Sequence, residues 1–213
     1  MACLIEVRDL TFGYEDIPIL ENLNLKVNNG EILLIEGDNG VGKTTLLKCI
    51  GSIVNGGKNI YFEGKHLLEH KDQIKNISFV MSEDTLYEYL TVGENIKFYK
   101  NLFSEKSSYD ERVKAYIQLF DIEQYYNVLV KNLSQGTRNK LYLAIMLSKN
   151  FKSLILDEPF TALDKSTQEK IISKIKFEAM NNNKSVIMVT HIDEFKKIAT
   201  RRITILKHAN WVQ

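Results

Sequence analysis

A glycine-rich segment near the amino terminus has the residue types and spacing needed to hold phosphate groups. Residues 37–44, GDNGVGKT, satisfy the pattern G-x-x-x-x-G-K-[ST] and stand between an apolar strand-like segment and a helix-like one. Glycines let backbone N–H groups turn toward phosphate oxygens, and the positive end of the following helix attracts the same anion. We expect Lys43 to neutralise the β- and γ-phosphates of a nucleoside triphosphate and the Thr44 hydroxyl to coordinate Mg²⁺. The residues predicted to contact the nucleotide in this segment are Asn39, Gly40, Gly42, Lys43, Thr44 and Thr45.

Two adjacent carboxylates follow an apolar segment in the second half of the chain. Residues 154–156 are aliphatic, Asp157 and Glu158 come next, and Pro159 ends the strand pattern. We expect Asp157 to hold Mg²⁺ and Glu158 to accept a proton from the water that attacks the γ-phosphate. Together the two motifs predict a nucleoside triphosphatase of the phosphate-loop class, and they leave kinases, GTPases and motor ATPases open.

A third segment narrows this class. Residues 133–137, LSQGT, stand about twenty residues before Asp157 and open an apolar helix pattern. The segment resembles the signature motif of ATP-binding cassette (ABC) proteins, usually LSGGQ. Ser134, Gly136 and the helix amino terminus form a second predicted anion-binding surface. The resemblance extends over nearly the whole chain.

The resemblance implies roles for further residues. Tyr14 matches the aromatic residue that stacks on adenine in the family, and the alternative is a core tyrosine. His191 resembles the histidine that contacts the γ-phosphate at the end of a strand, which adds it to Glu158 and Lys43 as a catalytic candidate. Residues 161–164, TALD, look like the loop through which paired cassettes communicate.

The resemblance also implies a function, with ATP and Mg²⁺ as ligands. We expect an ATP-hydrolysing subunit that powers a membrane transporter, an exporter of a small solute or peptide rather than an importer. Its implied partners are membrane-spanning subunits on separate chains and a second nucleotide-binding domain, in a homodimer or a heterodimer. The implied location is cytoplasmic, at the inner face of the cell membrane. The alternative is a soluble ABC-type ATPase that acts as a mechanical or regulatory switch.

The chain departs from the family pattern at several positions. Gln135 replaces a glycine and Thr137 replaces the final glutamine of the signature, and Glu36 stands before the phosphate loop where the family has an apolar residue. Ser82 falls where the family has a glutamine that touches the metal site. Ser82 is therefore a candidate metal contact, and Glu83 is the alternative.

The elements that must position these residues alternate between strand and helix. Buried strands are predicted at residues 31–35, 77–81, 153–156 and 185–190, and a helix at residues 44–50. We expect an α/β fold, a phosphate-loop NTPase core with a mostly parallel sheet. The resemblance adds an antiparallel β layer near residues 22–27 and 60–80 and an inserted helical subdomain near residues 95–145.

The expected organisation is one ABC-type domain over residues 1–213. Its core and β layer cover about 1–85 and 151–213, and its helical subdomain covers about 86–150. Within the subdomain, Ser108 and Glu111 are predicted to cap a helix over residues 108–120 whose apolar face carries Val113, Tyr116, Ile117 and Phe120. Ser166 and Glu169 are predicted to cap a later helix whose apolar face carries Ile171, Ile172 and Ile175.

Composition excludes several other classes of protein. With 28 Lys and Arg against 27 Asp and Glu, the chain lacks the basic footprint of a nucleic-acid-binding protein, so no nucleic-acid partner is expected. No apolar run approaches the ~20 residues that span a bilayer. Cys3 and Cys49 are too few for a disulfide framework and are expected to be buried. Residues 66–70, HLLEH, match a zinc-peptidase pattern, but a solvated segment is expected there.

Overall fold

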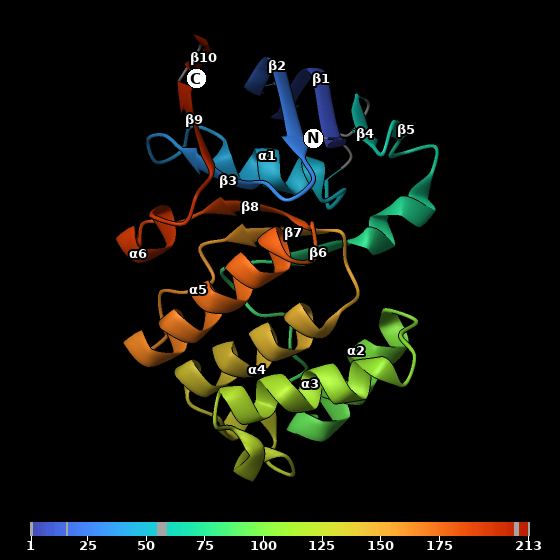
Figure 1. Ribbon diagram of the computed structural model, residues 1–213, viewed down its shortest axis with the longest axis vertical. Coiled ribbons are helices and arrows are strands. Elements are labelled where there is room, and N and C mark those ends of the chain that lie inside the picture. Colours follow the sequence, from blue (N-terminus) through green and yellow to red (C-terminus); the bar gives the residue numbers. More distant parts are fainter. Residues whose placement is uncertain (1, 16, 55–58, 207–208, 213) are drawn as a thin grey trace.

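The computed structural model describes the whole chain except residues 1, 16, 55–58, 207–208 and 213. Two sheets and the helices around them form the layers seen in Figure 1. The larger sheet contains β3 (Ile32–Glu36), β6 (Ile77–Val80), β7 (Ser153–Asp157), β8 (Ser185–Val189), β9 (Arg201–Leu206) and β10 (Ala209–Val212). The smaller sheet contains β1 (Cys3–Tyr14), β2 (Ile17–Asn28), β4 (Ile60–Phe62) and β5 (Lys65–His66).

Strand pairing confirms the predicted α/β class. The larger sheet has the order β10-β9-β3-β8-β7-β6, and every pair in it is parallel except β9 with β10. The smaller sheet, in the order β2-β1-β4-β5, is antiparallel throughout. The four predicted buried strands are β3, β6, β7 and β8. Residues 77–80 were also placed in the antiparallel layer, and that part of the prediction is wrong because β6 pairs with β7.

The two faces of the parallel sheet bury against different partners. Successive residues of a strand point to opposite faces. Ile32 and Leu34 of β3 therefore join the core beneath α4 (Gln135–Ser148) and α5 (Lys165–Met180). Leu33 and Ile35 join the core that contains α1 (Lys43–Ile50) and the antiparallel sheet. A sheet covered on both faces explains why its central strands are apolar without alternation.

Helices fill the chain between β6 and β7. They are α2 (Val92–Leu102), α3 (Ser108–Leu119), the 3₁₀ helices η2 (Glu123–Tyr125) and η3 (Val130–Asn132), and α4. In Figure 1, α2 and α3 lie at the end of the molecule far from the antiparallel sheet. The face predicted for α3 is buried, including Tyr116 and Phe120. The remaining helical pieces are η1 (Lys71–Asn76) and α6 (Asp193–Lys196).

Both predicted capping pairs are wrong. Helix α3 starts at Ser108 itself, and its N-cap residue Ser107 has helical backbone angles and makes no side-chain cap bond. The hydroxyl of Ser108 instead accepts a hydrogen bond from Arg112 at 3.0 Å. Helix α5 is capped by Asp164, whose carboxylate accepts the Thr167 N–H at 2.8 Å, so the helix begins before Ser166.

A capping box that the sequence analysis missed opens α2. The hydroxyl of Thr91 accepts the N–H of Glu94 at 3.2 Å, and the Glu94 carboxylate accepts the N–H of Thr91 at 2.8 Å. The spacing of a threonine and a glutamate three residues apart was the available signal.

The structure also tests the predictions for the two cysteines and for the histidines of residues 66–70. Cys49 is buried as predicted, but Cys3 is exposed because it begins β1 at the rim of the smaller sheet. His66 ends a strand and His70 precedes a 3₁₀ helix, so they do not share a helix face. Within the described ranges there is no group of three or more His, Cys, Asp or Glu placed to hold a metal. Nor is any described helix both long and apolar enough to cross a membrane.

An ion-paired contact fixes α4 to the segment after β6. The guanidinium of Arg138 donates to both oxygens of Asp84, at 2.9 and 3.2 Å, and to Glu88 at 2.8 Å. The Asp84 side chain is only 5% exposed, whereas that of Glu88 is 53% exposed. Arg138 therefore positions the start of α4, which carries the predicted signature residues, against the loop that carries Ser82.

We predict that Arg138→Met lowers the free energy of unfolding by about 2 kcal/mol, because it leaves the Asp84 carboxylate buried without a counter-charge. In a double-mutant cycle with Asp84→Asn, the coupling energy should be about 1–2 kcal/mol. Glu88→Gln removes a contact of the same arginine at the solvent-exposed side and should cost less than about 0.5 kcal/mol. Urea unfolding of the parent, the single variants and the double variant, followed by circular dichroism, measures these free energies. A coupling energy indistinguishable from zero would contradict the positioning role of this pair.

Candidate functional site

A polar pocket of about 260 Å³ lies at the carboxyl-terminal edge of the parallel sheet. Strands β3, β7 and β8 are parallel and adjacent, so the segments that follow them meet at this edge. Nine of the residues predicted from the sequence line the pocket: Asn39, Gly40, Gly42, Lys43, Thr44, Thr45, Asp157, Glu158 and His191. Ile19 and Val189 also line it. They were missed because an aliphatic side chain carries no chemical signal in a sequence.

The loop between β3 and α1 has a backbone that only glycine adopts easily. Gly37 has a φ of 143°, and a Cβ there would stand 2.5 Å from the carbonyl oxygen of Ile205. Gly42, the N-cap of α1, has a φ of 104°. The ammonium group of Lys43 donates to the carbonyl oxygens of Gly37 and Asp38, at 2.7 and 2.9 Å, and so holds the loop curled around the pocket.

The amino terminus of α1 points an unneutralised positive end at the pocket. The first N–H groups of a helix have no acceptor within the helix. Gly42 offers no side chain to cap them, and the first turn contains no acidic residue. With the ammonium of Lys43 beside these groups, the loop is an anion-binding cradle.

Asp157 and Thr44 form an oxygen-rich contact on the wall of the pocket. The Thr44 hydroxyl donates to Asp157 Oδ1 at 3.1 Å, although 113 residues separate the two in sequence. Burial raises the pKa of Asp157 above its ordinary value, and the hydrogen bond from Thr44 and the charges of Lys48 and Lys43 offset part of this rise. A buried carboxylate short of positive charge, next to a hydroxyl oxygen, is a donor set that fits Mg²⁺.

Glu158 is held in a strained conformation next to His191. Its φ of 51° lies in the left-handed region, which is costly for a residue other than glycine. Its backbone N–H donates to the carbonyl oxygen of Val189 at 3.0 Å, and its Oε2 accepts a hydrogen bond from the backbone N–H of His191 at 3.2 Å. Oε1 is buried, lies 3.1 Å from His191 Nε2 and forms no hydrogen bond to any described residue. This oxygen is available to accept a proton.

Two predicted site residues lie outside the lining of this pocket. Tyr14 ends β1 with its side chain exposed and its ring edge-on to Phe12, so it is not a core tyrosine. The neighbouring strand β2, which pairs with β1, contributes Ile19 to the pocket wall. Ser82 is exposed in the loop after β6, two residues beyond the last paired residue, Val80. Glu83 is exposed in the same loop.

The predicted signature lies on a different surface of the chain. Ser134 is the N-cap of α4, and its hydroxyl oxygen accepts the N–H of Thr137 at 3.2 Å. Gly136 faces residues 161–164, since a Cβ there would lie 3.5 Å from the carbonyl oxygen of Ala162. Lys140 pairs with Asp164 at 2.8 Å, and together with Thr167 it holds the pKa of that carboxyl well below its usual range. The turn and the loop therefore form one exposed surface.

Comparison with known proteins identifies the family. A family model described as ABC transporter matches residues 20–161. A spermidine/putrescine import ATP-binding protein of Legionella pneumophila is 31% identical over 97% of this chain, and a sulfate/thiosulfate import ATP-binding protein of Bradyrhizobium diazoefficiens is 30% identical over 95%. A probable ABC transporter ATP-binding protein, p29, of Mycoplasma pneumoniae is 31% identical over 93% of this chain and 86% of its own length. The chain spans only 57% and 60% of the two import proteins.

Solved structures agree with the family match. An ATP-binding subunit of an ABC transporter superposes with a TM-score of 0.88 at 22% identity, over 96% of this chain and 86% of that chain. A dimeric ATP-binding cassette in a post-hydrolysis state, bound to ADP and phosphate, superposes with a TM-score of 0.82 at 25% identity, over 96% and 95% of the two chains. Because the family model covers more than half of the chain and three relatives are at least 30% identical over nearly all of it, this protein belongs to the ABC transporter family.

Proposed function

We propose that this chain binds and hydrolyses ATP as the nucleotide-binding subunit of a membrane transporter. The observation that carries the proposal is the convergence of Lys43 and Thr44 with Asp157 and Glu158 in one pocket, where Thr44 and Asp157 are in contact. We also propose the single-domain organisation, with residues 86–150 as the helical subdomain inserted between core segments 1–85 and 151–213. The family match and the structure bound to ADP and phosphate support this reading.

In this proposal the residues of the pocket divide the work on ATP. The backbone of Asn39, Gly40 and Gly42, with Lys43 and Thr45, holds the phosphates, and Tyr14 stacks on adenine outside the polar pocket. Thr44 and Asp157 hold Mg²⁺. The metal, when bound, neutralises charge on the β- and γ-phosphate oxygens.

Glu158 is the proposed general base and His191 its neighbour at the γ-phosphate. A water positioned at the phosphate gives its proton to the carboxylate as it attacks, and the ADP oxygen leaves with the bonding electrons. His191 holds Glu158 in place through its backbone N–H and brings its imidazole to Oε1. Holding the carboxylate in a strained conformation reduces its freedom to turn away from the water.

Ser134 and Gly136 belong to the proposed site of a second chain. Ser134 is exposed and Gly136 is partly exposed, and neither lines the pocket formed by Lys43 in the same chain. Placed opposite the pocket of a partner, the amino terminus of α4 adds a second helix end to the γ-phosphate. Such an interface is the same on both subunits of a two-fold dimer.

We further propose membrane-spanning subunits on separate chains as partners, and a cytoplasmic position at the inner face of the membrane. One of the two import proteins named above is named for spermidine and putrescine import, and the other for sulfate and thiosulfate import. These names favour import, whereas the sequence-based prediction of an exporter has no support among them and stays a prediction. The alternative of a soluble switch has no support among them either. Transport assays after reconstitution with the membrane subunits test both the direction and the alternative.

We predict that Lys43→Ala and Glu158→Gln affect different steps. Loss of the Lys43 ammonium should weaken ATP binding by about 10–100-fold, because a charged hydrogen bond to the phosphates is lost. Glu158→Gln keeps the shape of the side chain and should leave ATP affinity intact while slowing turnover by about 10²–10⁴-fold. Calorimetric binding and phosphate release measure the two effects. Lys114→Ala, at an exposed lysine of α3 outside the pocket lining, is the control for Lys43. A Glu158→Gln protein that turns over at nearly the parental rate would make His191 the next candidate base.

We predict that ATP and Mg²⁺ drive the Glu158→Gln protein into a two-fold dimer, since slow turnover keeps the triphosphate in place. Sedimentation velocity should show the dimer with ATP and a monomer with ADP. Adding Ser134→Glu should restore the monomer, because a carboxylate at that position repels the partner's γ-phosphate. Adding Ser107→Glu, at an exposed serine outside the proposed interface, should have no effect. A monomer under all these conditions would count against the homodimer.

We predict that Ser82 contributes little to hydrolysis. Its side chain is exposed and shorter than the glutamine of the family, so it reaches a metal only through water. Ser82→Ala should change phosphate release by only a few fold, and Glu83→Ala by less, whereas Thr44→Ala should cause a large loss. If either loop substitution slowed hydrolysis about 100-fold, a loss of about 2.7 kcal/mol, the loop would hold a catalytic ligand after all.

A further inference from the structure

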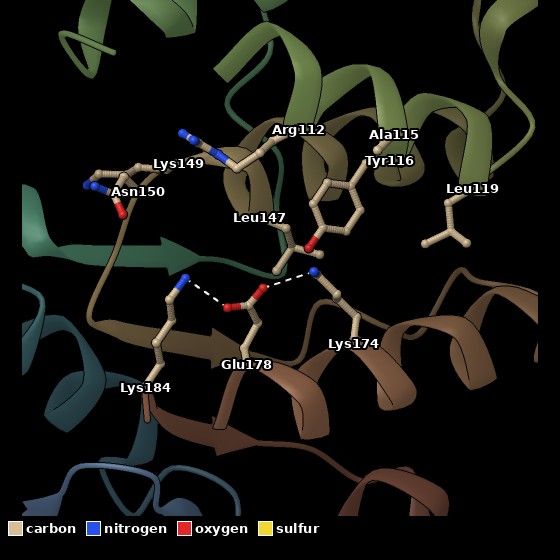
Figure 2. A pocket seen from close by; sticks show the side chains of 10 residues that line it. All are labelled: Arg112, Ala115, Tyr116, Leu119, Leu147, Lys149, Asn150, Lys174, Glu178 and Lys184. Atoms are coloured by element: carbon tan, nitrogen blue, oxygen red, sulfur yellow. Dashed lines mark ion pairs between the residues drawn. The ribbon is translucent and has the colours of Figure 1, made fainter. Parts of the chain in front are cut away.

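A second pocket, of about 310 Å³, lies at the opposite edge of the parallel sheet from the nucleotide pocket. Asn150 and Lys184 line it and lie just before β7 and β8 begin, whereas the nucleotide pocket follows the ends of β3 and β7. The two pockets share no residue. Figure 2 shows the side chains that line the second one, which come from α3, the end of α4 and the residues after it, α5, and the residue before β8: Arg112, Ala115, Tyr116, Leu119, Leu147, Lys149, Asn150, Lys174, Glu178 and Lys184.

The floor of this pocket is a buried carboxylate between two lysines. Glu178 is only 8% exposed, and its two oxygens pair with Lys174 at 3.0 Å and with Lys184 at 2.8 Å. In Figure 2 the two ammonium groups approach Glu178 from opposite sides. Burial alone would raise the pKa of Glu178, but the hydrogen bonds from Asn182, Lys184 and Lys174 lower it to about 2. The carboxylate is therefore ionised at neutral pH and neutralises one of the two lysines.

The remaining cations leave the pocket with a surplus of positive charge. Arg112 pairs with Glu105 at 2.8 Å. Lys149 donates to the carbonyl oxygen of Ile77 and lies over the ring of Phe103, and no carboxylate in the described part of the chain is within ion-pair distance of it. The four cations that line the pocket outnumber the two carboxylates paired with them, so this group of side chains has a net charge of +2 when all are ionised. Burial lowers the pKa of Lys149 to about 8, so an anion nearby would favour its charged form.

The opposite wall of the pocket is apolar. Ala115, Tyr116 and Leu119 come from successive turns of α3, and Leu147 comes from the last turn of α4. Figure 2 shows the ring of Tyr116 extending from α3 with its hydroxyl directed toward Lys174 and Glu178. The ring is buried in the fold except where it meets the pocket. The pocket thus has a cationic floor and an apolar roof.

We propose that this pocket binds a small organic anion with an apolar body, such as an arylalkyl carboxylate, through Lys174 and Lys184 at its charged end and Tyr116, Leu119 and Leu147 at its apolar end. A volume near 300 Å³ is at the lower end of the range for small-molecule sites, which limits the body to one ring or a short chain. An inorganic anion has no apolar group to contact the apolar roof, so we expect it to bind more weakly. An uncharged analogue leaves the surplus positive charge unpaired.

The pocket lies next to two elements that also carry proposed nucleotide-site residues, α4 and β7. Leu147 belongs to α4, whose first turn carries Gly136, and Asn150 leads into β7, which ends at Asp157. A bound anion contacts the last turn of α4 and lies beside the segment that leads into β7. It also joins α3 of the helical insertion to α5 of the core.

Binding of 4-phenylbutyrate to the full chain, measured by ¹H–¹⁵N NMR titration, tests the proposal. We expect saturable shifts centred on residues 112–119, 147–150 and 174–184. The uncharged 4-phenylbutanamide should bind at least about tenfold more weakly, a difference of about 1.4 kcal/mol, and inorganic phosphate should cause no saturable shift there. Equal affinity for the amide and the carboxylate, or no saturable shift with the carboxylate, would overturn the proposal.

Matched variants locate the site. Ala115→Trp places an indole in the pocket and should abolish binding, whereas Lys114→Trp, at an exposed position on the same helix outside the lining, should leave it unchanged. Lys174→Gln removes one cation and leaves Lys184 and Asn182 on Glu178, so we expect a folded protein with at least about fivefold weaker binding. Lys176→Gln, an exposed neighbour on α5, should not change the affinity. Equal weakening by both lysine variants would mean that the anion binds through general charge rather than in this pocket.

Discussion

The parallel pairing of β3, β8 and β7 is the constraint on which the rest of the structure depends. These strands are almost entirely buried, and their register fixes where each one ends. Because they run in the same direction, the glycine loop after β3 and the carboxylates at the end of β7 emerge at the same edge of the sheet, on either side of β8. The contact between Thr44 and Asp157 is the visible result, made across more than half of the chain. An antiparallel arrangement would have put these groups at opposite edges.

Three buried carboxylates are stabilised in three different ways. Asp84 has a bidentate arginine, and its role is positional. Glu178 has two lysines and an asparagine, which keep it ionised at the floor of the second pocket. Asp157 has only the hydroxyl of Thr44 and more distant lysines, and burial leaves its pKa raised. The carboxylate with the least complete set of partners is the one that faces the nucleotide pocket, as expected of a group whose remaining partner is a ligand.

Helix α4 connects the regions for which we propose a function. Ser134 caps its amino terminus, Gly136 in its first turn touches the loop of residues 161–164, and Arg138 binds it to the segment after Ser82. Its last turn forms part of the roof of the second pocket through Leu147. The middle of the helix is buried on nearly all sides, including Ala144 and Ile145. The two ends of the helix are therefore connected by continuous buried contacts.

The sequence by itself determined the chemistry of the nucleotide pocket and the order of the elements. A glycine loop with Lys43 and Thr44, and a strand ending in Asp157 and Glu158, have strong local signatures because phosphate binding restricts residue type at fixed spacing. The apolar runs of β3, β7 and β8 were equally readable. The residues that cap the helices could not be predicted in the same way. Asp164 and Thr91 accept backbone N–H groups whose position depends on where each helix starts.

Only the tertiary structure decided which distant side chains meet. The assignment of β6 to the parallel sheet, the pairing of Arg138 with Asp84 and the exposure of Ser82 depend on packing between segments that are far apart in sequence. The second pocket is the clearest case. Arg112, Lys149, Lys174 and Lys184 belong to no common motif and come from separate elements, and they gather around Glu178 because α3 and α5 pack against the same end of the sheet. Such a cluster cannot be predicted from the spacing of residues along the chain, because the contacts that form it are made between elements rather than within them.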